Sequence, residues 1–269
     1  MIRQPAVAGR FYPGTAEELE RALESCLGAG ETPAKQRALA CMVPHAGYPY
    51  SGAIAGAVYR RIAPPARIIL LGPRHFPYGE PMAILSEGSW MTPLGPATID
   101  TQLAEELKRA CPLLREDRLA HEREHSLEVQ LPFLQRISGE FSFVPIVLGT
   151  IVLAALEELG EALARVVAAQ PGPVLLLASS DMNHYESDSL TRRKDQKAIE
   201  RILHLDPRGL FETVAREQIS MCGFAAAISM MAAALRLGAS RAELASYATS
   251  GDVTGDREAV VGYAGVIVQ

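Results

Sequence analysis

Cysteine is scarce in this 269-residue chain, and its four copies suggest no pairing. Cys26, Cys41, Cys111 and Cys222 lie far apart and form no C-x-x-C motif, so neither a disulfide scaffold nor a zinc ribbon is indicated. An isolated cysteine is usually a small apolar residue of the interior. We therefore expect Cys26, Cys41 and Cys111 to be buried thiols.

Long apolar runs and targeting signals are also missing. No stretch stays apolar over enough residues to cross a bilayer. The first residues, MIRQPAVAGRFYPG, lack both the apolar core and the small-residue cleavage site of a secretory signal. We expect a cytoplasmic protein that does not act at a membrane.

An excess of positive charge is the third absence. The chain has 26 Lys and Arg against 31 Asp and Glu, a net charge of -5, and its basic residues form no stripe. Binding to a phosphate backbone requires such a stripe, so we expect no nucleic-acid partner. No repeat, low-complexity tract or interdomain linker interrupts the chain. Its length fits one large α/β domain, which we expect to span residues 1–269.

Short apolar runs alternate with longer segments of helical periodicity. This alternation is typical of parallel strands whose sheet is covered by helices on both faces. We expect strands over residues 39–43, 66–71, 143–148, 174–178, 244–248 and 260–268. We expect helices over residues 16–26, 102–110, 153–169, 192–203, 207–215 and 224–237. The predicted fold class is α/β, a single three-layer domain with a mostly parallel central sheet.

Local signals refine this prediction at three places. Thr15 and Glu18 fit a capping box at the start of the first helix. Residues 31–36 are expected to form a loop. The glycine- and proline-rich stretch 72–95 is predicted to be a loop with one short strand at 82–85.

Histidines follow two of the predicted strands directly. His45 comes after ALACMV and His75 after ARIILLGPR, while LLLASS leads into Asp181 and His184. In open α/β sheets functional groups gather beyond the carboxyl ends of the strands. Imidazole is the commonest metal ligand in proteins. Although a single loop histidine is more often structural, three at equivalent positions favour a metal site at this edge.

A third ligand and a turn complete the hypothesis. Cys222 directly precedes the helical run FAAAISMMAAALRLG, and a helix N-terminus favours the thiolate that binds metals, although burial as a small apolar residue is the alternative. After His45 we expect a tight turn in which Gly47 and Gly52 adopt conformations closed to other residues. Such a turn would leave open coordination positions.

The segment His121 to His125 matches the H-E-x-x-H motif of zinc proteases. In such proteases the motif lies on a buried helix, whereas the surrounding sequence DRLAHEREHS is polar throughout. We therefore prefer a solvated polar loop leading to an amphipathic helix, VQLPFLQRI.

Eight segments, taken together and in order, resemble the Memo family, named for an animal mediator of cell motility. They are PAVAGRFYPGTAEELE, PHAGYPYSGAIAGAVY, LGPRHF, EHSLEVQLPFLQ, VPIVLG, SSDMNHYES, CGFAAAI and YATSGD. The resemblance runs over nearly the whole chain. It is far more specific than any single motif above.

The resemblance implies a fold similar to the class III extradiol dioxygenases, whose catalytic subunits bind non-haem Fe(II) through two histidines and a carboxylate. In Memo-like proteins two histidines and a cysteine line the corresponding pocket, which by motif are His45, His75 and Cys222. Asp181 and His184 match further pocket residues. The EHSLE segment is a family hallmark, so the resemblance implies that His125 and Glu128 buttress or line the pocket.

The activity of the dioxygenases does not follow automatically, because a thiolate replaces their carboxylate. A softer ligand changes the preference among metals, with iron expected first and copper or zinc as alternatives. In animals the family is linked to binding phosphorylated receptor tails and to copper-dependent redox chemistry. Prokaryotic relatives are often encoded beside a radical-SAM protein, which makes such a protein an expected partner.

From these expectations we predict a metal-dependent redox enzyme or enzyme-like protein, with O2 or a small organic substrate at the open coordination positions. His45, His75 and Cys222 would hold the ion, and His184, oriented by Asp181, would act as general acid or base. Tyr48 and Tyr185 are expected at the mouth of the pocket, and Arg74 could pair with a phosphate. One rival is a module that binds a peptide in the same pocket without turnover. The other is a zinc hydrolase.

Overall fold

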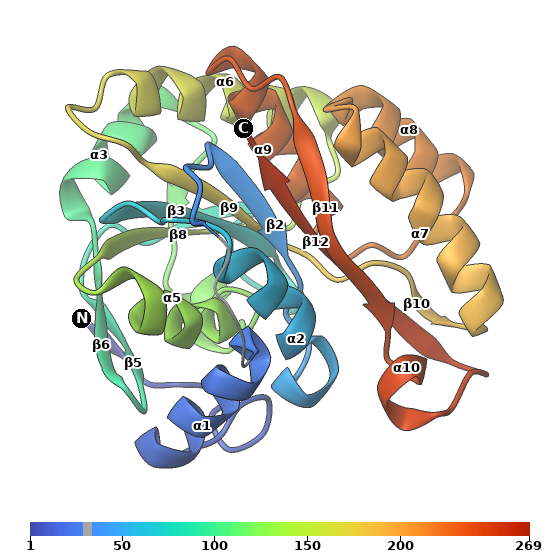
Figure 1. Ribbon diagram of the computed structural model, residues 1–269. Coiled ribbons are helices and arrows are strands. Elements are labelled where there is room, and N and C mark those ends of the chain that lie inside the picture. Colours follow the sequence, from blue (N-terminus) through green and yellow to red (C-terminus); the bar gives the residue numbers. More distant parts are fainter. Residues whose placement is uncertain (29–33) are drawn as a thin grey trace.

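Twelve strands form one mixed sheet in the part of the chain that the computed structural model describes, residues 1–28 and 34–269 (Figure 1). The strands are β1 (Ile2–Arg3), β2 (Ala40–Val43), β3 (Arg67–Pro73), β4 (Met82–Ile84), β5 (Ser89–Thr92), β6 (Gly95–Ile99), β7 (Arg115–Glu116), β8 (Ser142–Leu148), β9 (Leu175–Ser179), β10 (His184–Glu186), β11 (Ala242–Thr249) and β12 (Val260–Val268). Their order is β1-β5-β6-β8-β3-β9-β2-β12-β10, with β11 beside β12 and β4 beside β8 and β7.

The centre of the sheet is parallel. Strands β6, β8, β3, β9 and β2 run in the same direction, and β12 joins β2 antiparallel. Parallel neighbours end at a common edge, so the loops that follow β2, β3 and β9 leave the sheet side by side. This edge carries the candidate site.

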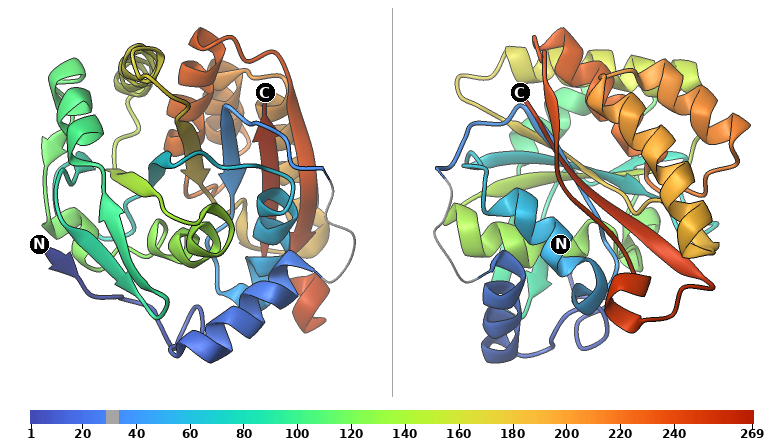
Figure 2. Two further views of the ribbon diagram at one scale, coloured as in Figure 1. Left: turned by 60° about the vertical axis from the view of Figure 1, so that its left-hand side comes forward. Right: turned by 45° about the vertical axis from the view of Figure 1, so that its right-hand side comes forward.

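Helices cover both faces, which gives three layers (Figure 2). They are α1 (Ala16–Leu27), α2 (Tyr48–Tyr59), α3 (Thr101–Ala110), α4 (Leu119–Glu122), the 3-10 turn η1 (Glu128–Gln130), α5 (Leu131–Ser138), α6 (Leu153–Ala168), α7 (Asp188–Leu203), α8 (Pro207–Arg216), α9 (Phe224–Arg236) and α10 (Gly251–Thr254). Helices α3, α6, α7, α8 and α9 pack on one face, and α1, α2 and α5 on the other. The structure is thus a single α/β domain.

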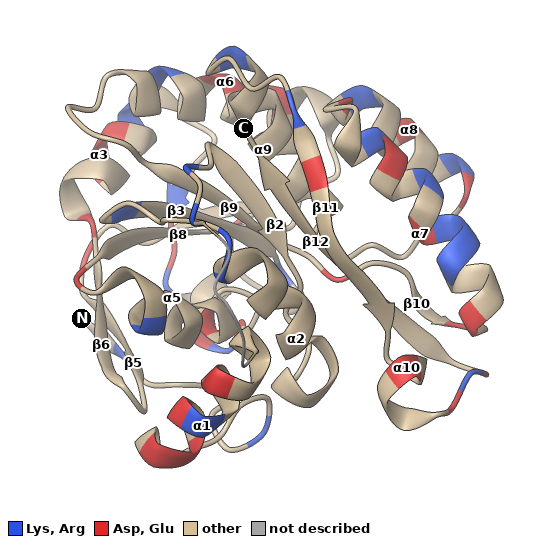
Figure 3. Cartoon of the chain, viewed as in Figure 1, with Lys and Arg blue, Asp and Glu red and all other residues tan. Residues whose placement is uncertain are grey.

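Alternation along each strand explains the two cores. In β3, Ile69 and Leu71 belong to the core under α6 and α9, whereas Ile68 and Leu70 belong to the core under α2 and α5. Since successive side chains of a strand point to opposite faces, a strand buried on both faces is a continuous apolar run. Charged residues lie mostly on the outer helices (Figure 3).

The predicted fold class is confirmed, and most predicted elements agree with the structure. All six main strands and all six helices are present, with ends that differ by at most a few residues. The cap of α1 also forms, since the Glu18 amide donates to Oγ1 of Thr15, and the Glu18 carboxylate contacts that hydroxyl. Of the predicted loop at 31–36, residues 31–33 lie outside the described residues, and residues 34–36 belong to no helix or named strand.

The segment after His45 was predicted wrongly. Instead of a tight turn, helix α2 begins at Tyr48, and Gly47 has an ordinary φ of -54°. Gly52 lies inside this helix, where a β-carbon would collide with the sulfur of Cys26 on α1. Glycine is therefore needed at position 52 because α1 and α2 pack closely there, and not because the backbone has an unusual conformation.

Two further differences concern the loop at 72–95 and a cysteine. That stretch also holds β5, which forms a hairpin with β6. Cys41 and Cys111 are buried as expected, but Cys26 is only partly buried. Among the described residues, none of the helices has the length and apolar character needed to span a bilayer.

Candidate metal centre

Three neighbouring strands deliver candidate residues to the same edge of the sheet. β2 is followed by His45, β3 by His75 and β9 by Asp181. β9 pairs in parallel with both β2 and β3, so the three chain segments emerge together. This is the crevice in which open α/β sheets place their ligands.

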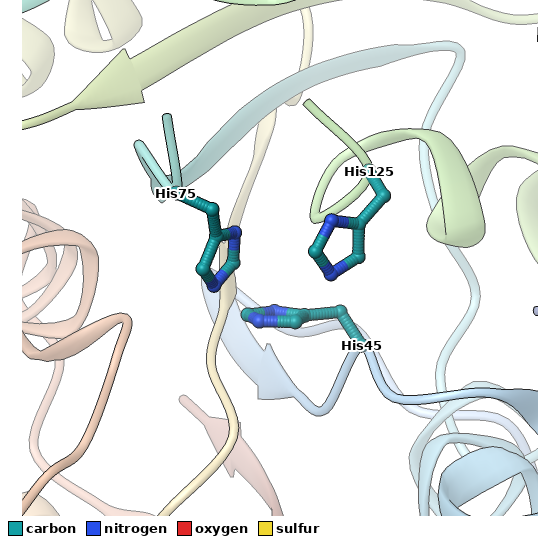
Figure 4. Close-up of side chains that lie close together, drawn as sticks. All are labelled: His45, His75 and His125. Atoms are coloured by element: carbon teal, nitrogen blue, oxygen red, sulfur yellow. The ribbon is translucent and has the colours of Figure 1, made fainter. Parts of the chain in front are cut away.

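His45 and His75 meet a third imidazole, that of His125, which comes from the loop between α4 and η1 (Figure 4). One ring nitrogen of each lies within 4.8 Å of those of the other two. The ring centroids of His75 and His125 are 4.6 Å apart and stacked at 20°, and both lie edge-on to His45 at 5.3 and 5.6 Å. Three positive rings at these distances would repel one another, so the arrangement disfavours protonation of all three together.

The protonation of His45 follows from the hydrogen bonds of Ser179. The Ser179 hydroxyl donates to the Ser126 carbonyl at 2.6 Å and accepts from the Gln130 amide at 2.9 Å. Its contact with Nδ1 of His45, also 2.9 Å, therefore requires the ring to donate. The lone pair is on Nε2. Burial, together with the neighbouring His75, lowers the pKa of His45 well below its usual value.

Glu124 gives His75 the matching orientation. Its carboxylate accepts from the His75 amide at 2.7 Å and faces Nδ1 of the ring at 2.8 Å. Burial opposes ionisation of Glu124, but the hydrogen bond and charge of His75 outweigh it and lower the carboxyl pKa to about 2. Burial likewise lowers the pKa of His75, and Glu124 more than compensates, so that it is raised. Glu124 keeps a proton on Nδ1, so Nε2 is the atom that a metal ion would bind, displacing any proton it carries.

His125 is held mainly by ring packing. Phe11 meets its ring edge-on at 4.7 Å. Burial, followed by repulsion from His45, lowers the pKa of His125 to about 4, so the ring is neutral near pH 7. It was expected only to buttress or line the pocket, and the structure makes it the third member of the histidine cluster.

Cys222 lies against His45. Its Sγ is 3.2 Å from Nε2 of His45 and accepts from the Asp181 amide at 3.3 Å. Gly223, the N-cap of α9, lets this contact form, because a β-carbon there would collide with the Ser179 carbonyl. Burial and the nearby Asp181 raise the pKa of Cys222 well above its usual value, so the free thiol keeps its proton. Since Nε2 of His45 is an acceptor, the thiol can donate to it.

Asp181 and His184 lie nearby but do not form the expected pair. Asp181 accepts from the His45 amide at 2.7 Å, and its other oxygen is 4.0 Å from Nε2 of that ring. Burial raises the pKa of this carboxyl. His184 instead directs Nδ1 at the Ser220 carbonyl, 2.9 Å away. Ser220, rather than Asp181, therefore orients the ring.

Two tyrosines were also expected at the pocket, and they differ sharply in solvent exposure. Tyr48 is buried, and its hydroxyl donates to the Val129 carbonyl at 2.8 Å, so its contacts are those of a core residue. Tyr185 is 77% exposed beside His184 and has a positive φ of 59°.

Arg74 and Glu128, the two charged residues expected at the pocket, make structural contacts instead. The Arg74 guanidinium bonds the carbonyl groups of Gly79 and Glu80 and so closes the loop after β3. Glu128 is fully buried in an ion pair with Arg3. It acts behind the site rather than in it.

The H-E-x-x-H segment does not form a protease helix. α4 ends at Glu122, and His121 is buried with Nδ1 facing the Asp117 carbonyl, apart from the cluster that holds His125. The preferred alternative, a solvated loop, is only partly right: Arg118, Glu122 and Arg123 are exposed, but Glu124 and Ser126 are fully buried. The Glu124 carboxylate and the Ser126 hydroxyl are satisfied by partners that the local sequence does not reveal.

Comparison with known proteins supports the family resemblance over nearly the whole chain. The model of the family described as "Memo-like protein" matches residues 3–267. The chain belongs to the Memo family. It is 42% identical to MEMO1 family proteins of Methanopyrus kandleri and Methanosarcina barkeri, covering 99% and 100% of both chains respectively. Among solved structures, an uncharacterized protein of Escherichia coli K12 shares the fold, with a TM-score of 0.51 and 12% identity over 84% of this chain and 99% of the other.

The donor atoms of this Memo-family chain fit a transition-metal ion. Two imidazoles have Nδ1 engaged by Ser179 and Glu124, which leaves Nε2 as the ligating atom, and hydrogen-bonded second partners of this kind are typical of ligating histidines. Imidazole and thiol ligands suit iron, copper and zinc rather than magnesium or calcium. Ser179 and Glu124 were not foreseen, although both lie in segments that the sequence had singled out.

Proposed function

We propose that this Memo-family protein binds one transition-metal ion, iron first and copper or zinc as alternatives, and uses it in redox chemistry on a small organic substrate. The observation that supports the proposal is the convergence of three imidazoles, two of them oriented by hydrogen bonds, beside a thiol. Iron is preferred because of the resemblance to the extradiol dioxygenases.

The proposed ligands are His45, His75 and Cys222. Two ligand atoms bonded to one ion at about 2.0–2.3 Å, with near-tetrahedral angles, are roughly 3.3–3.7 Å apart. The 3.2 Å between Nε2 of His45 and Sγ of Cys222 is close to that separation, so little movement of either side chain would be needed. Binding a cation would displace the thiol proton. His125 lies in the same cluster, so its replacement belongs to the test.

The remaining residues have defined tasks in this proposal. When bound, the ion would supply Lewis acidity and, for iron or copper, a route for electrons. Ser179 and Glu124 keep the ring protons on Nδ1, and Asp181 fixes the backbone of His45. His184 is only partly buried and has Nδ1 engaged with Ser220, which leaves Nε2 to exchange a proton with a substrate.

Anaerobic purification with elemental analysis, followed by O2 uptake with catechol-type substrates, tests the proposal. We expect retained iron and substrate-dependent O2 consumption, both lost in His45→Ala. The variant His184→Gln should keep its metal and lose about 100-fold in turnover, as for a general acid or base. Zinc without O2 uptake would instead favour a hydrolase. Ligand binding without turnover would favour a binding module.

A further inference from the structure

A cavity of about 650 Å³ borders the histidine cluster. One wall is the N-terminal segment from Met1 to Phe11, and the other is the segment around α4, from Arg118 to His125. It therefore reaches the ring of His125, which also belongs to the cluster. Its volume is in the range of small-molecule pockets.

Buried charge fixes both walls of this cavity. Arg3 donates to the His121 carbonyl at 2.8 Å, to the Glu124 carbonyl at 2.7 Å and to the Glu128 carboxylate at 2.7 Å. The same carboxylate accepts from the amides of Ala6 and Val7, at 2.8 and 3.0 Å. Arg3 and Glu128 thus join the two segments, and the cavity is formed before any ligand arrives.

Three further arginines line the cavity: Arg10, Arg118 and Arg123. All three are exposed, and within the described chain their guanidinium groups form no ion pair or hydrogen bond. Arg123 lies over the ring of Phe76 at 5.0 Å, which leaves the N–H edges of its guanidinium free. Among the described residues of the lining, Glu122 alone is acidic. On a chain of net charge -5, this is a local excess of positive charge.

Apolar rings complete the lining next to the histidine cluster. Phe11 contacts His125 edge-on at 4.7 Å, and Phe76 follows His75 in the chain. A ligand that satisfies both features has an anionic group and an apolar body. Guanidinium groups bind carboxylate and phosphate oxygens in paired hydrogen bonds, whereas a neutral ligand offers these three arginines no opposite charge.

We propose that this cavity binds a small organic anion, a carboxylate or phosphate ester, by means of Arg10, Arg118 and Arg123. The apolar body of the anion lies between Phe11 and Phe76, towards His125. This assignment rests on the proposed function in naming the anion as the substrate class of the metal centre. Binding of the anion itself needs no metal.

Calorimetric titration with benzoate, phenyl phosphate and neutral benzyl alcohol tests this assignment. The three ligands share a ring and differ in charge, and the two anions separate carboxylate from phosphate sources. The test variant replaces Arg10, Arg118 and Arg123 by alanine. The control is Arg193→Ala, an exposed arginine on α7, which packs on the opposite face of the sheet.

We expect at least one anion to bind, benzyl alcohol to bind at least about tenfold more weakly, and the triple variant to lose at least about tenfold in affinity for the anion. Arg193→Ala should match the wild type. Equal binding of the neutral ligand, an unaffected triple variant, or no binding of either anion would overturn the assignment.

Metal content separates this result from the proposed function. After chelation, the wild type and His45→Ala should bind the anion equally, because neither the ion nor His45 is needed for it. The triple variant should retain its metal. A wild type that binds the anion but no metal would contradict only the redox proposal. A wild type that binds metal but does not prefer the anions over benzyl alcohol would contradict only the cavity assignment.

Discussion

Nε2 of His45 lies 3.2 Å from Sγ of Cys222, although 177 residues separate the two in the chain. The contact depends on the parallel pairing of β2 with β9 and on the glycine that lets α9 begin against the end of β9. A protonated thiol facing an imidazole lone pair is a stable arrangement without metal. It also gives an incoming cation two donor atoms at a suitable separation.

Replacing Ser179 by alanine is expected to weaken metal binding by about 10–100-fold, the usual effect of losing a partner that orients a ligating histidine. The ring of His45 would lose the acceptor for its Nδ1 proton. Competition with a chelator measures the change. Ser229→Ala is the control, because its fully buried hydroxyl donates to the Leu156 carbonyl away from the site. Equal losses in both variants would show that the effect is structural.

Glu124→Gln should weaken metal binding by at least about tenfold. The amide keeps the size of the side chain but removes the charge that holds the Nδ1 proton of His75. Glu122→Gln, two residues earlier and exposed, is the matched control and should leave the affinity unchanged. If the Glu124 variant binds metal as well as the wild type, the orientation of His75 does not matter for binding.

Arg3→Met should lower the free energy of unfolding by about 3–5 kcal/mol, because it leaves the buried Glu128 carboxylate without its charge partner. Arg21→Ala, which removes an exposed ion pair with Glu17, should cost less than about 1 kcal/mol. Urea denaturation of both variants gives the comparison. A small effect of Arg3→Met would mean that the N-terminal wall of the cavity is held in another way.

Asp195 should make stability fall as the pH rises. Burial raises its pKa to about 7, although Tyr247 and the Asn183 amide donate to it and oppose the shift. The folded state then holds a proton that the unfolded state releases near pH 4. The stabilising contribution of Asp195 to folding is therefore complete below about pH 4 and is lost as the pH rises through about 7.

The variant Asp195→Asn removes this titration while keeping groups that can pair with both neighbours. Its free energy of unfolding should change less than that of the wild type between about pH 5 and about pH 8. Parallel slopes for the two proteins would show that Asp195 ionises normally in the folded chain.

Positions that strand ends determine could be predicted from the sequence, whereas positions that tertiary partners determine could not. His45 and His75 could be found because each follows an apolar strand, and the edge of a parallel sheet brings such ends together. The helix after His45 was missed because glycines that allow contact with α1 also resemble turn signals. Glu124 was assigned to a solvated loop because local polarity does not reveal a buried partner.

The roles of Ser179 and Glu124 could not be predicted from the sequence either. Each depends on a hydrogen bond to a residue distant in the chain, and no periodicity encodes such a pair. Cys222 was identified by its position before a helix, yet only the packing of Gly223 against β9 brings it to His45. Only the family resemblance implied that Cys222 lies in one pocket with His45 and His75.

The most direct test of the metal centre is X-ray absorption spectroscopy of the iron-loaded protein beside Cys222→Ser and His125→Gln. We predict one sulfur neighbour at about 2.3 Å together with imidazole nitrogens, as is general for thiolate and histidine ligands. The sulfur signal should vanish in Cys222→Ser and persist in His125→Gln. A wild-type spectrum with only nitrogen and oxygen neighbours would contradict the account.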